Sequence, residues 1–240
     1  MSKNVQFSFS DKNVALVSKT DHLEQRIEAL ETMMLAQKGE NIKYIKNPTH
    51  DQCIAALNDP FSIKYIEKTF EFCMLAVCGN PHTMEFIPLN NFPEDQRNEL
   101  LKTAVSKAGT TLKYIPECYM TPELCLLAIH SEIMSIMYVP VKYEYAQVWR
   151  SAAYINPRYV TLTEECPDLY RDMKDYALRI DPMAVEYVKD PSEEAIEKYI
   201  KAYPSYAWEH SGKVYVNTLN PSKKIKRMMF WKSMGRWKVV

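Results

Sequence analysis

The chain has 240 residues, of which 47% are hydrophobic and 25% are charged, and its 30 basic and 30 acidic side chains leave no formal net charge. This composition excludes disorder for the chain as a whole, and the length is sufficient for a substantial core. No apolar run approaches the roughly 18 residues that span a bilayer, and the first residues lack the basic segment and apolar block of a secretory signal. We therefore expect an intracellular soluble protein without a membrane partner.

Residues 4–18 are predicted to form two short strands. Val5, Phe7 and Phe9 alternate with polar residues, and a polar turn at residues 10–13 leads into a second apolar stretch. Alternation with a period of two residues is typical of a half-buried strand. We expect these strands to form a small β piece at the N-terminal end.

A helix is predicted for residues 20–38, with apolar residues at spacings of four, three and four: Leu23, Ile27, Leu30 and Met34. Such a stripe has two interpretations. It can be two heptads of a coiled coil, through which the chain would form a homo-oligomer, or it can be the buried face of a helix that packs on its own domain. Coiled coils normally show three or four heptads, so the sequence favours the second interpretation.

One pattern recurs about seven times between residues 41 and 209, at intervals of roughly 21 to 28 residues, which is typical of stacked repeats. An apolar run leads to an alanine, and an aromatic residue follows ten positions later. The clear pairs are Ala76 with Phe86, Ala104 with Tyr114, Ala128 with Tyr138 and Ala177 with Tyr187, and Ala56 with Tyr65 is a nine-residue version. Looser copies place their aromatic residue at Tyr44 and Tyr159.

Each copy is predicted to be a helix, a turn and a shorter second helix that carries the aromatic residue. The turns often contain Asn-Pro or Asp-Pro, which end one helix and allow the next to begin: Asp59-Pro60, Asn80-Pro81, Asn156-Pro157 and Asp181-Pro182. A unit this small cannot cover its own apolar face, so neighbours must stack. We expect the alanine to permit close approach of helices and the aromatic ring to fill the gap between layers.

Three of the six cysteines stand three residues before a repeat alanine, at Cys53, Cys73 and Cys125. This position indicates small buried side chains, and we expect free thiols. Cys73, Cys78 and His82 lie close in sequence, but their spacing is not that of a zinc site and a fourth ligand is missing. We therefore predict no metal site.

Residues 211–240 contain eight basic residues and no acidic residue. Residues 213–219 alternate as a strand would, and residues 228–240 resemble two more short strands, so we expect a second β piece at this end. The candidate surface for a protein partner, or for the phosphates and bases of a nucleic acid, consists of Lys223, Lys224, Lys226, Arg227, Trp231, Lys232, Arg236, Trp237 and Lys238. Alternatively, the tryptophans anchor this segment to the repeats and the charges pair with acidic residues of the same chain.

The repeated E-x-C-x-x-A pattern, followed by a turn and a Tyr-apolar-Pro ending, resembles the helical repeats catalogued as domain of unknown function 4116 (DUF4116). The resemblance covers residues 41–209 and is strongest in four copies. It implies a helical-repeat fold and an origin in a phage or another virus, and hence a location in the host cytoplasm or the virion. It supplies no catalytic residues.

The sequence thus predicts a mainly α protein, an α-solenoid-like array of short helix pairs with small β pieces at both ends. Its parts would be residues 1–40, the array at 41–209 and the basic segment at 210–240. The five glycines lie too far apart for a phosphate-binding loop, so we expect no nucleotide cofactor. The histidines form no recognisable triad, and the acidic runs stand at predicted helix starts, where negative charge is favourable. We predict a non-enzymatic protein that binds another protein, with nucleic-acid binding as the alternative and a hydrolase least favoured.

Overall fold

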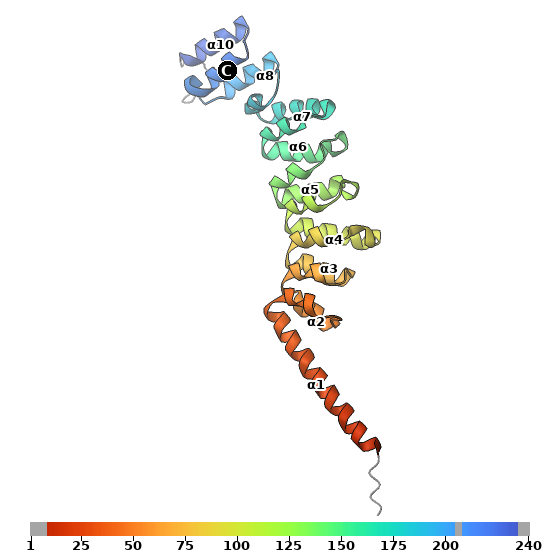
Figure 1. The fold of residues 1–240 in the computed structure, drawn as a ribbon. Coiled ribbons are helices and arrows are strands. Elements are labelled where there is room, and N and C mark those ends of the chain that lie inside the picture. The colour runs from red at the N-terminus through yellow and green to blue at the C-terminus, as the bar shows by residue number, and fades with distance from the viewer. Residues whose placement is uncertain (1–8, 205–207, 235–240) are drawn as a thin grey trace, which may run out of the picture. The chain divides into compact units, whose positions relative to one another are not determined.

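The computed structural model describes the backbone of residues 9–204 and 208–234 (Figure 1). These residues form α-helices and short 3-10 helices, with one π-helical turn, and no strand occurs among them. The prediction of a mainly α protein is confirmed. The contacts within the chain divide it into two compact units, residues 1–114 and 115–240, which are described one at a time.

The first unit begins with a long helix and continues with three shorter α-helices, each followed by a 3-10 helix. Its elements are α1 (Phe9–Gln37), η1 (Gly39–Tyr44), α2 (His50–Ala56), η2 (Pro60–Tyr65), α3 (Phe70–Gly79), η3 (Pro81–Phe86), η4 (Leu89–Asn91), α4 (Glu94–Lys107) and η5 (Gly109–Tyr114). α1 contacts α2, and α3 packs against α4, while η1, η2, η3 and η5 contact one another in succession (Figure 1). In this unit the 3-10 helices thus form a continuous series of contacts, and the α-helices contact one another in the pairs α1–α2 and α3–α4.

The second unit continues the alternation of α-helices and 3-10 helices. It ends in a π-helical turn and two α-helices that do not follow this alternation. Its elements are η6 (Glu117–Tyr119), α5 (Pro122–Ser131), η7 (Ile133–Tyr138), η8 (Tyr143–Tyr145), α6 (Ala146–Ile155), η9 (Pro157–Thr163), α7 (Pro167–Ile180), η10 (Pro182–Tyr187), α8 (Glu193–Ala202), η11 (Trp208–Gly212), α9 (Lys213–Thr218) and α10 (Lys223–Ser233). α6 packs between α5 and α7, η9 contacts η10, and α10 packs on α8.

Side chains at the helix starts explain why the chain folds into this alternation. Backbone N–H groups in the first turns of α2, α3, α5, α8 and α10 donate to hydroxyl groups of the preceding residue, which are Thr49, Thr69, Thr121, Ser192 and Ser222. The 3-10 helices begin in the same way at the predicted Asn-Pro and Asp-Pro pairs. Carboxyl or amide oxygens of Asp59, Asn80, Asn156 and Asp181 accept backbone hydrogen bonds of 2.8–3.2 Å. The predicted role of these pairs is confirmed.

The repeat alanines lie in the interior of the two units. Ala56, Ala76, Ala104, Ala128 and Ala177 are all completely buried. In most copies the carbonyl oxygen of the alanine also accepts a hydrogen bond, 2.8–3.0 Å long, from the backbone N–H four residues later, as in Asn80 to Ala76 and Glu132 to Ala128. This bond ends the α-helix and turns the chain into the 3-10 helix.

The aromatic residue does not fill the interior as predicted. Tyr65 and Tyr138 are exposed, and Phe86, Tyr114 and Tyr187 are half-buried. The buried side chain stands two residues earlier, at Ile63, Met84, Leu112, Ile136 and Val185. A 3-10 helix has about three residues per turn, so residues two apart point to different sides. The aromatic ring therefore lies at the edge of the core, while an aliphatic residue occupies its centre.

The loose copy in the second unit has a different register from the predicted one. Ala152 is its completely buried alanine, and its carbonyl accepts the N–H of Asn156. Counting ten residues from Ala152 leads to Leu162, so Tyr159 is not the equivalent of the other aromatic residues. The buried aliphatic position is Val160, two residues before Leu162.

The predicted β pieces are wrong wherever the structure describes them. Residues 9–18 belong to α1, residues 213–218 form α9, and residues 228–233 belong to α10. Residues 4–8 and 235–240 lie outside the described residues. In α10 the buried positions follow helical spacing at Ile225, Met228, Met229 and Lys232. A segment this short can show an alternating pattern whether it forms a strand or a helix, and here packing on α8 favours the helix.

Candidate functional site

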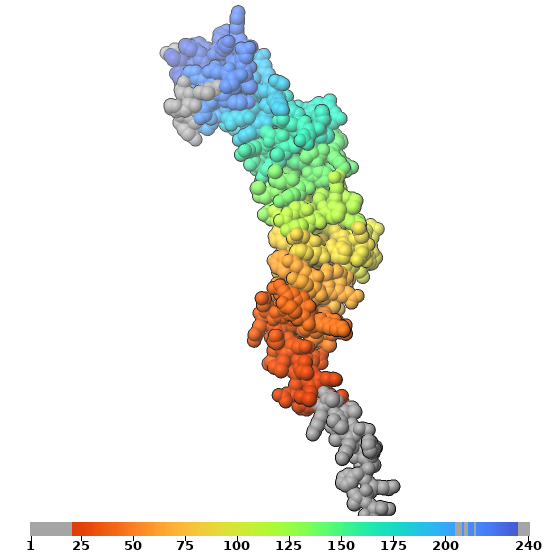
Figure 2. Space-filling model, in the orientation of Figure 1, coloured from red at the N-terminus to blue at the C-terminus, as the bar shows by residue number. Residues whose placement is uncertain are grey.

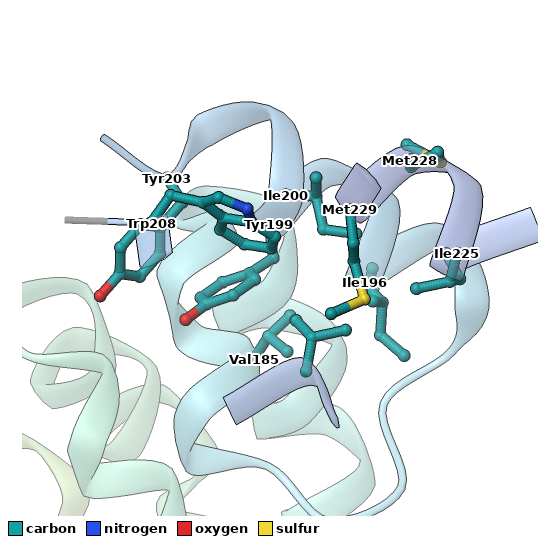
Figure 3. Close-up of a cluster of buried hydrophobic side chains, with 11 residues drawn as sticks. Val185, Ile196, Tyr199, Ile200, Tyr203, Trp208, Ile225, Met228 and Met229 are labelled. Atoms are coloured by element: carbon teal, nitrogen blue, oxygen red, sulfur yellow. The ribbon is translucent and has the colours of Figure 1, made fainter. Parts of the chain in front are cut away.

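α10 has two faces, and this arrangement divides the predicted binding residues between surface and interior. Ile225, Met228 and Met229 lie in a buried cluster together with residues of η10, α8, η11 and α9 (Figure 3). The opposite face is exposed and carries basic and aromatic side chains: Lys223, Lys226, Arg227, Phe230 and Trp231. These residues are three or four positions apart and therefore share one side of the helix.

The exposed face contains an open pocket of about 400 Å³. Its lining consists of Lys223, Lys224, Arg227, Met228 and Trp231. Trp231 of this lining forms an edge-to-face pair with Phe230, and the two ring centroids are 5.7 Å apart. The pocket combines positive charge with apolar walls, a combination that suits an anionic group carried on an apolar stem.

Lys224 is less available than its neighbours. Its ammonium group forms an ion pair with Glu197 of α8, and this hydrogen bond raises the pKa of Lys224. Ser222 likewise donates to Glu193. The alternative in which basic residues of this segment pair with acids of the same chain is therefore confirmed for Lys224.

Lys232 belongs to the interior and not to a binding surface. Its ammonium group donates to the carbonyl oxygens of Tyr203 at 2.7 Å and Lys201 at 3.4 Å, and it lies 5.8 Å from the centroid of the Trp208 ring. Burial lowers the pKa of Lys232, because a charge is less stable away from water. The prediction of Lys232 as a partner-binding residue is wrong. Its physical role is to donate hydrogen bonds to carbonyl groups at the end of α8, because the last carbonyl groups of a helix have no N–H partner within the helix.

The buried cluster below α10 fixes the position of this helix. Trp208 is fully buried, donates from Nε1 to the hydroxyl of Ser233 at 3.3 Å, and packs edge to face on Tyr203 (Figure 3). The Tyr199 hydroxyl donates to Glu186 at 2.5 Å, and burial raises the pKa of Tyr199. The predicted anchoring tryptophan thus exists, but it is Trp208, and Trp231 faces solvent. Arg236, Trp237 and Lys238 lie outside the described residues.

A second basic and aromatic surface lies on the 3-10 helices of the first unit. Lys43 stands 5.7 Å from the centroid of Tyr65 in the next copy, and Lys64 stands 4.3 Å from the centroid of Phe86 in the following copy. In both cases, a lysine of one copy therefore contacts the aromatic ring of the next copy. Cation–π contacts of this kind stabilise exposed sites by about 0.5–1 kcal/mol each, so the row has a structural role of its own.

The second unit also contains a polar pocket between α6 and α7. It has a volume of about 640 Å³, and its lining includes Arg150, Asp172, Asp175 and Arg179. Arg150 and Asp172 form an ion pair of 2.5 Å across the two helices. The opposite charges of this ion pair therefore neutralise one another within the pocket.

The cysteines behave as packing residues. Cys53, Cys73 and Cys125 are buried free thiols, as predicted, and burial raises the pKa of Cys73 to about 11 and of Cys125 to about 12. No group of three or more metal-binding side chains occurs within the part of the chain that the structure describes. Across the same residues, no helix is both long and apolar enough to cross a membrane.

Comparisons with protein-family models, with curated proteins and with solved structures found no match for this chain.

Proposed function

We propose that this chain is a non-enzymatic α-solenoid-like scaffold that binds another protein through the exposed face of α10. The observation that carries the proposal is the exposed Phe230–Trp231 pair beside Lys223 and Arg227. Tryptophan and arginine are the residues that most often dominate the binding energy of protein interfaces. Large apolar side chains on a surface, rimmed by polar ones, are typical of protein-binding sites.

The scaffold part of the proposal rests on the repeated contacts. Within a unit, α3 contacts α4, α5 and α7 contact α6, and η1, η2, η3 and η5 contact one another in succession, and contacts between neighbouring copies are how stacked arrays are stabilised. Such arrays bind partners through extended surfaces and commonly have terminal segments unlike their repeats. Here α9 and α10 differ from the repeats, and α10 carries the proposed binding face.

The chemistry of the partner follows from the charge of the face. Lys223, Lys226 and Arg227 are exposed, whereas Lys224 already has a carboxylate partner and Lys232 is buried. The complementary surface is therefore acidic, with an apolar group that covers Trp231. The resemblance to viral helical repeats suggests that the partner is a component of a virion or of its assembly, or a host protein that the chain recruits as an adaptor.

Nucleic-acid binding through the same face is the second candidate. Lysine and arginine can neutralise phosphates, and an exposed tryptophan can stack on a base. Two of the predicted basic residues contribute little, because Lys224 is paired and Lys232 is buried. The described part of the face thus has fewer charges than the sequence suggested, and we favour the protein partner.

Quantitative affinity capture with three forms of the chain tests the proposal. The forms are the wild type, the double variant Arg227→Glu with Trp231→Ala, and a control, Lys64→Glu, on the aromatic row of the first unit. Loss of two hot-spot residues should reduce capture of a true partner at least about 30-fold, and the control should retain it. A partner that binds the double variant and the wild type equally would exclude this face.

A labelled oligonucleotide separates the two candidates. The nucleic-acid alternative requires binding that weakens steeply with salt and that Arg227→Glu reduces. Absence of such binding, together with capture of a protein by the wild type alone, supports the protein partner.

A further inference from the structure

The apolar stripe of α1 is uncovered in the chain. The side chains of residues 21–30 are all exposed, and Leu23, Ile27, Leu30 and Met34 are each more than half exposed. Within residues 21–37 of α1, contact with the repeats is made near the end of the helix, through the buried Leu35 and through Glu31, which accepts a hydrogen bond of 2.9 Å from the Gln52 amide. The prediction that this stripe packs on its own domain is therefore wrong.

The observed length of α1 removes the objection to a coiled coil. Because the helix begins at Phe9, the heptad that runs through the stripe continues toward the N-terminus for more than three heptads in total. In the sequence, the d positions are Phe9, Leu16, Leu23 and Leu30, and the a positions are Asn13, Thr20, Ile27 and Met34. Leucine at d with isoleucine at a favours two strands, and an asparagine at a fixes the register.

The charges beside the stripe select the orientation of the two helices. Arg26 occupies a g position and Glu31 the e position five residues later, and Lys19 and Glu24 repeat this arrangement one heptad earlier. In a parallel, in-register pair, each g residue meets the e residue of the partner helix, so both pairs are attractive. In an antiparallel pair, g meets g and e meets e, which would bring like charges together.

The repeats leave this stripe accessible. Leu35 occupies a b position and Glu31 an e position, so the side of α1 that meets α2 lies next to the a/d stripe and does not cover it. A free helix with ten successive exposed residues has little to stabilise it in water, whereas a second copy would bury the stripe.

We propose that α1 forms a parallel two-stranded coiled coil with α1 of a second copy of this chain. The proposal is independent of the function assigned to α10. It makes the protein a dimer in which two sets of repeats are joined at their N-terminal ends.

Sedimentation of the full chain at about 100 µM tests the dimer, because self-association follows mass action. The expected mass is twice the 28.0 kDa of one chain. Ile27→Asp should reduce self-association at least about 100-fold, because it places a charge at the centre of the seam. Gln25→Asp introduces the same charge at an f position on the outer side of α1 and should leave the dimer intact.

The repeats serve as an internal control, because Ile27 and Gln25 are exposed and neither variant should change their thermal unfolding. A wild-type chain that remains a monomer at this concentration would overturn the proposal and leave the stripe to a helix of another protein. A trimer or tetramer would overturn the two-stranded arrangement, and so would a dimer that Ile27→Asp does not weaken.

Exchanging the two charges tests the orientation. Arg26→Glu and Glu31→Lys should each weaken the homodimer about tenfold, since each brings like charges together twice. An equimolar mixture of the two variants should regain wild-type association, because both pairs become attractive again in the mixed dimer. The hydrogen bond between Gln52 and Glu31 lies within one chain, so mixing the two variants does not change it. Recovery of association in the mixture therefore measures only the charge pairs between the two helices. Failure of the mixture to recover would overturn the parallel register.

Discussion

Two amphipathic helices, α1 and α10, carry similar apolar stripes, but the stripe of α10 is buried and that of α1 is exposed. In α10 the stripe of Ile225, Met228 and Met229 is buried by η10, α8, η11 and α9 of the same unit. In α1 the stripe of Leu23 and Ile27 is exposed, whereas Leu35 near the end of the helix is buried against the repeats. Periodicity indicates that a helix has an apolar face, but what covers that face depends on contacts far away in the sequence. The comparison thus separates an apolar face that is buried within its own unit from one that its own unit leaves exposed.

The largest effect is expected at Trp208, the residue that holds α10 in place. Trp208→Ala removes a fully buried ring and should lower the free energy of unfolding of the second unit by about 3–5 kcal/mol. Trp231→Ala is the matched control, because Trp231 is 40% exposed and its loss should cost much less. Urea unfolding monitored by circular dichroism measures both. Equal effects would mean that the two tryptophans have been assigned to the wrong faces.

The same comparison can be made within α1 by two identical substitutions five residues apart. Leu35→Ala should cost about 2–4 kcal/mol in the first unit, because Leu35 is 1% exposed. Leu30→Ala should cost almost nothing at a concentration that keeps the chain monomeric, because Leu30 is 59% exposed and alanine is a good helix former. A large loss in the dilute Leu30→Ala protein would show that the repeats cover the stripe after all.

A smaller effect is expected from Lys232→Met, which removes two hydrogen bonds to carbonyl groups but keeps the length of the side chain. Loss of these bonds should lower the free energy of unfolding by about 1–3 kcal/mol near neutral pH.

The substitution of Lys232 also has a predicted pH dependence. Burial lowers the pKa of Lys232 in the folded chain below that in the unfolded chain, where it is 10.5. The unfolded state therefore binds more protons in the window between the two values, and the contribution of Lys232 to stability rises as the pH rises through it. The advantage of the wild type over Lys232→Met should grow toward pH 10. An advantage that shrinks would show that the ammonium group is not desolvated.

The smallest effect concerns thiol reactivity. Burial keeps the pKa of Cys73 at about 11 and that of Cys125 at about 12, so both thiols stay protonated at neutral pH. Exposed Cys78 and Cys118 should react rapidly with a thiol reagent in the native chain, and the buried thiols should react only on unfolding. Mass spectrometry of the labelled peptides identifies them. Rapid labelling of Cys125 in the folded protein would contradict its place in the core.

Features that depend on local chemistry could be predicted from the sequence. The repeat alanines, the buried cysteines and the Asn-Pro and Asp-Pro turns were all identified, because each performs the same task in every copy. The register of the loose copy could also have been found: the ten-residue rule applied to Ala152 leads to Leu162. The aromatic residue at Tyr159 obscured that rule.

Features that depend on long-range packing could not be predicted in the same way. Val214 and Val216 in a seven-residue segment satisfy a strand pattern, and only the packing of α9 against its neighbours decides for a helix. Lys232 was assigned to the surface because it is charged. Its spacing of three and seven from Met229 and Ile225 was the one signal that placed it on the buried face. The aromatic residues of the repeats were assigned to the core because of their size, although the tight turn of a 3-10 helix directs them to its edge.

Hydrogen exchange measured at two protein concentrations tests the contrast between α1 and α10 most directly, because amide protection reports local opening of each helix. We predict that the amides of residues 21–34 exchange rapidly in dilute protein and slowly in concentrated protein, while the amides of residues 225–232 are protected at both concentrations. Protection of residues 21–34 that does not change with concentration would contradict the account.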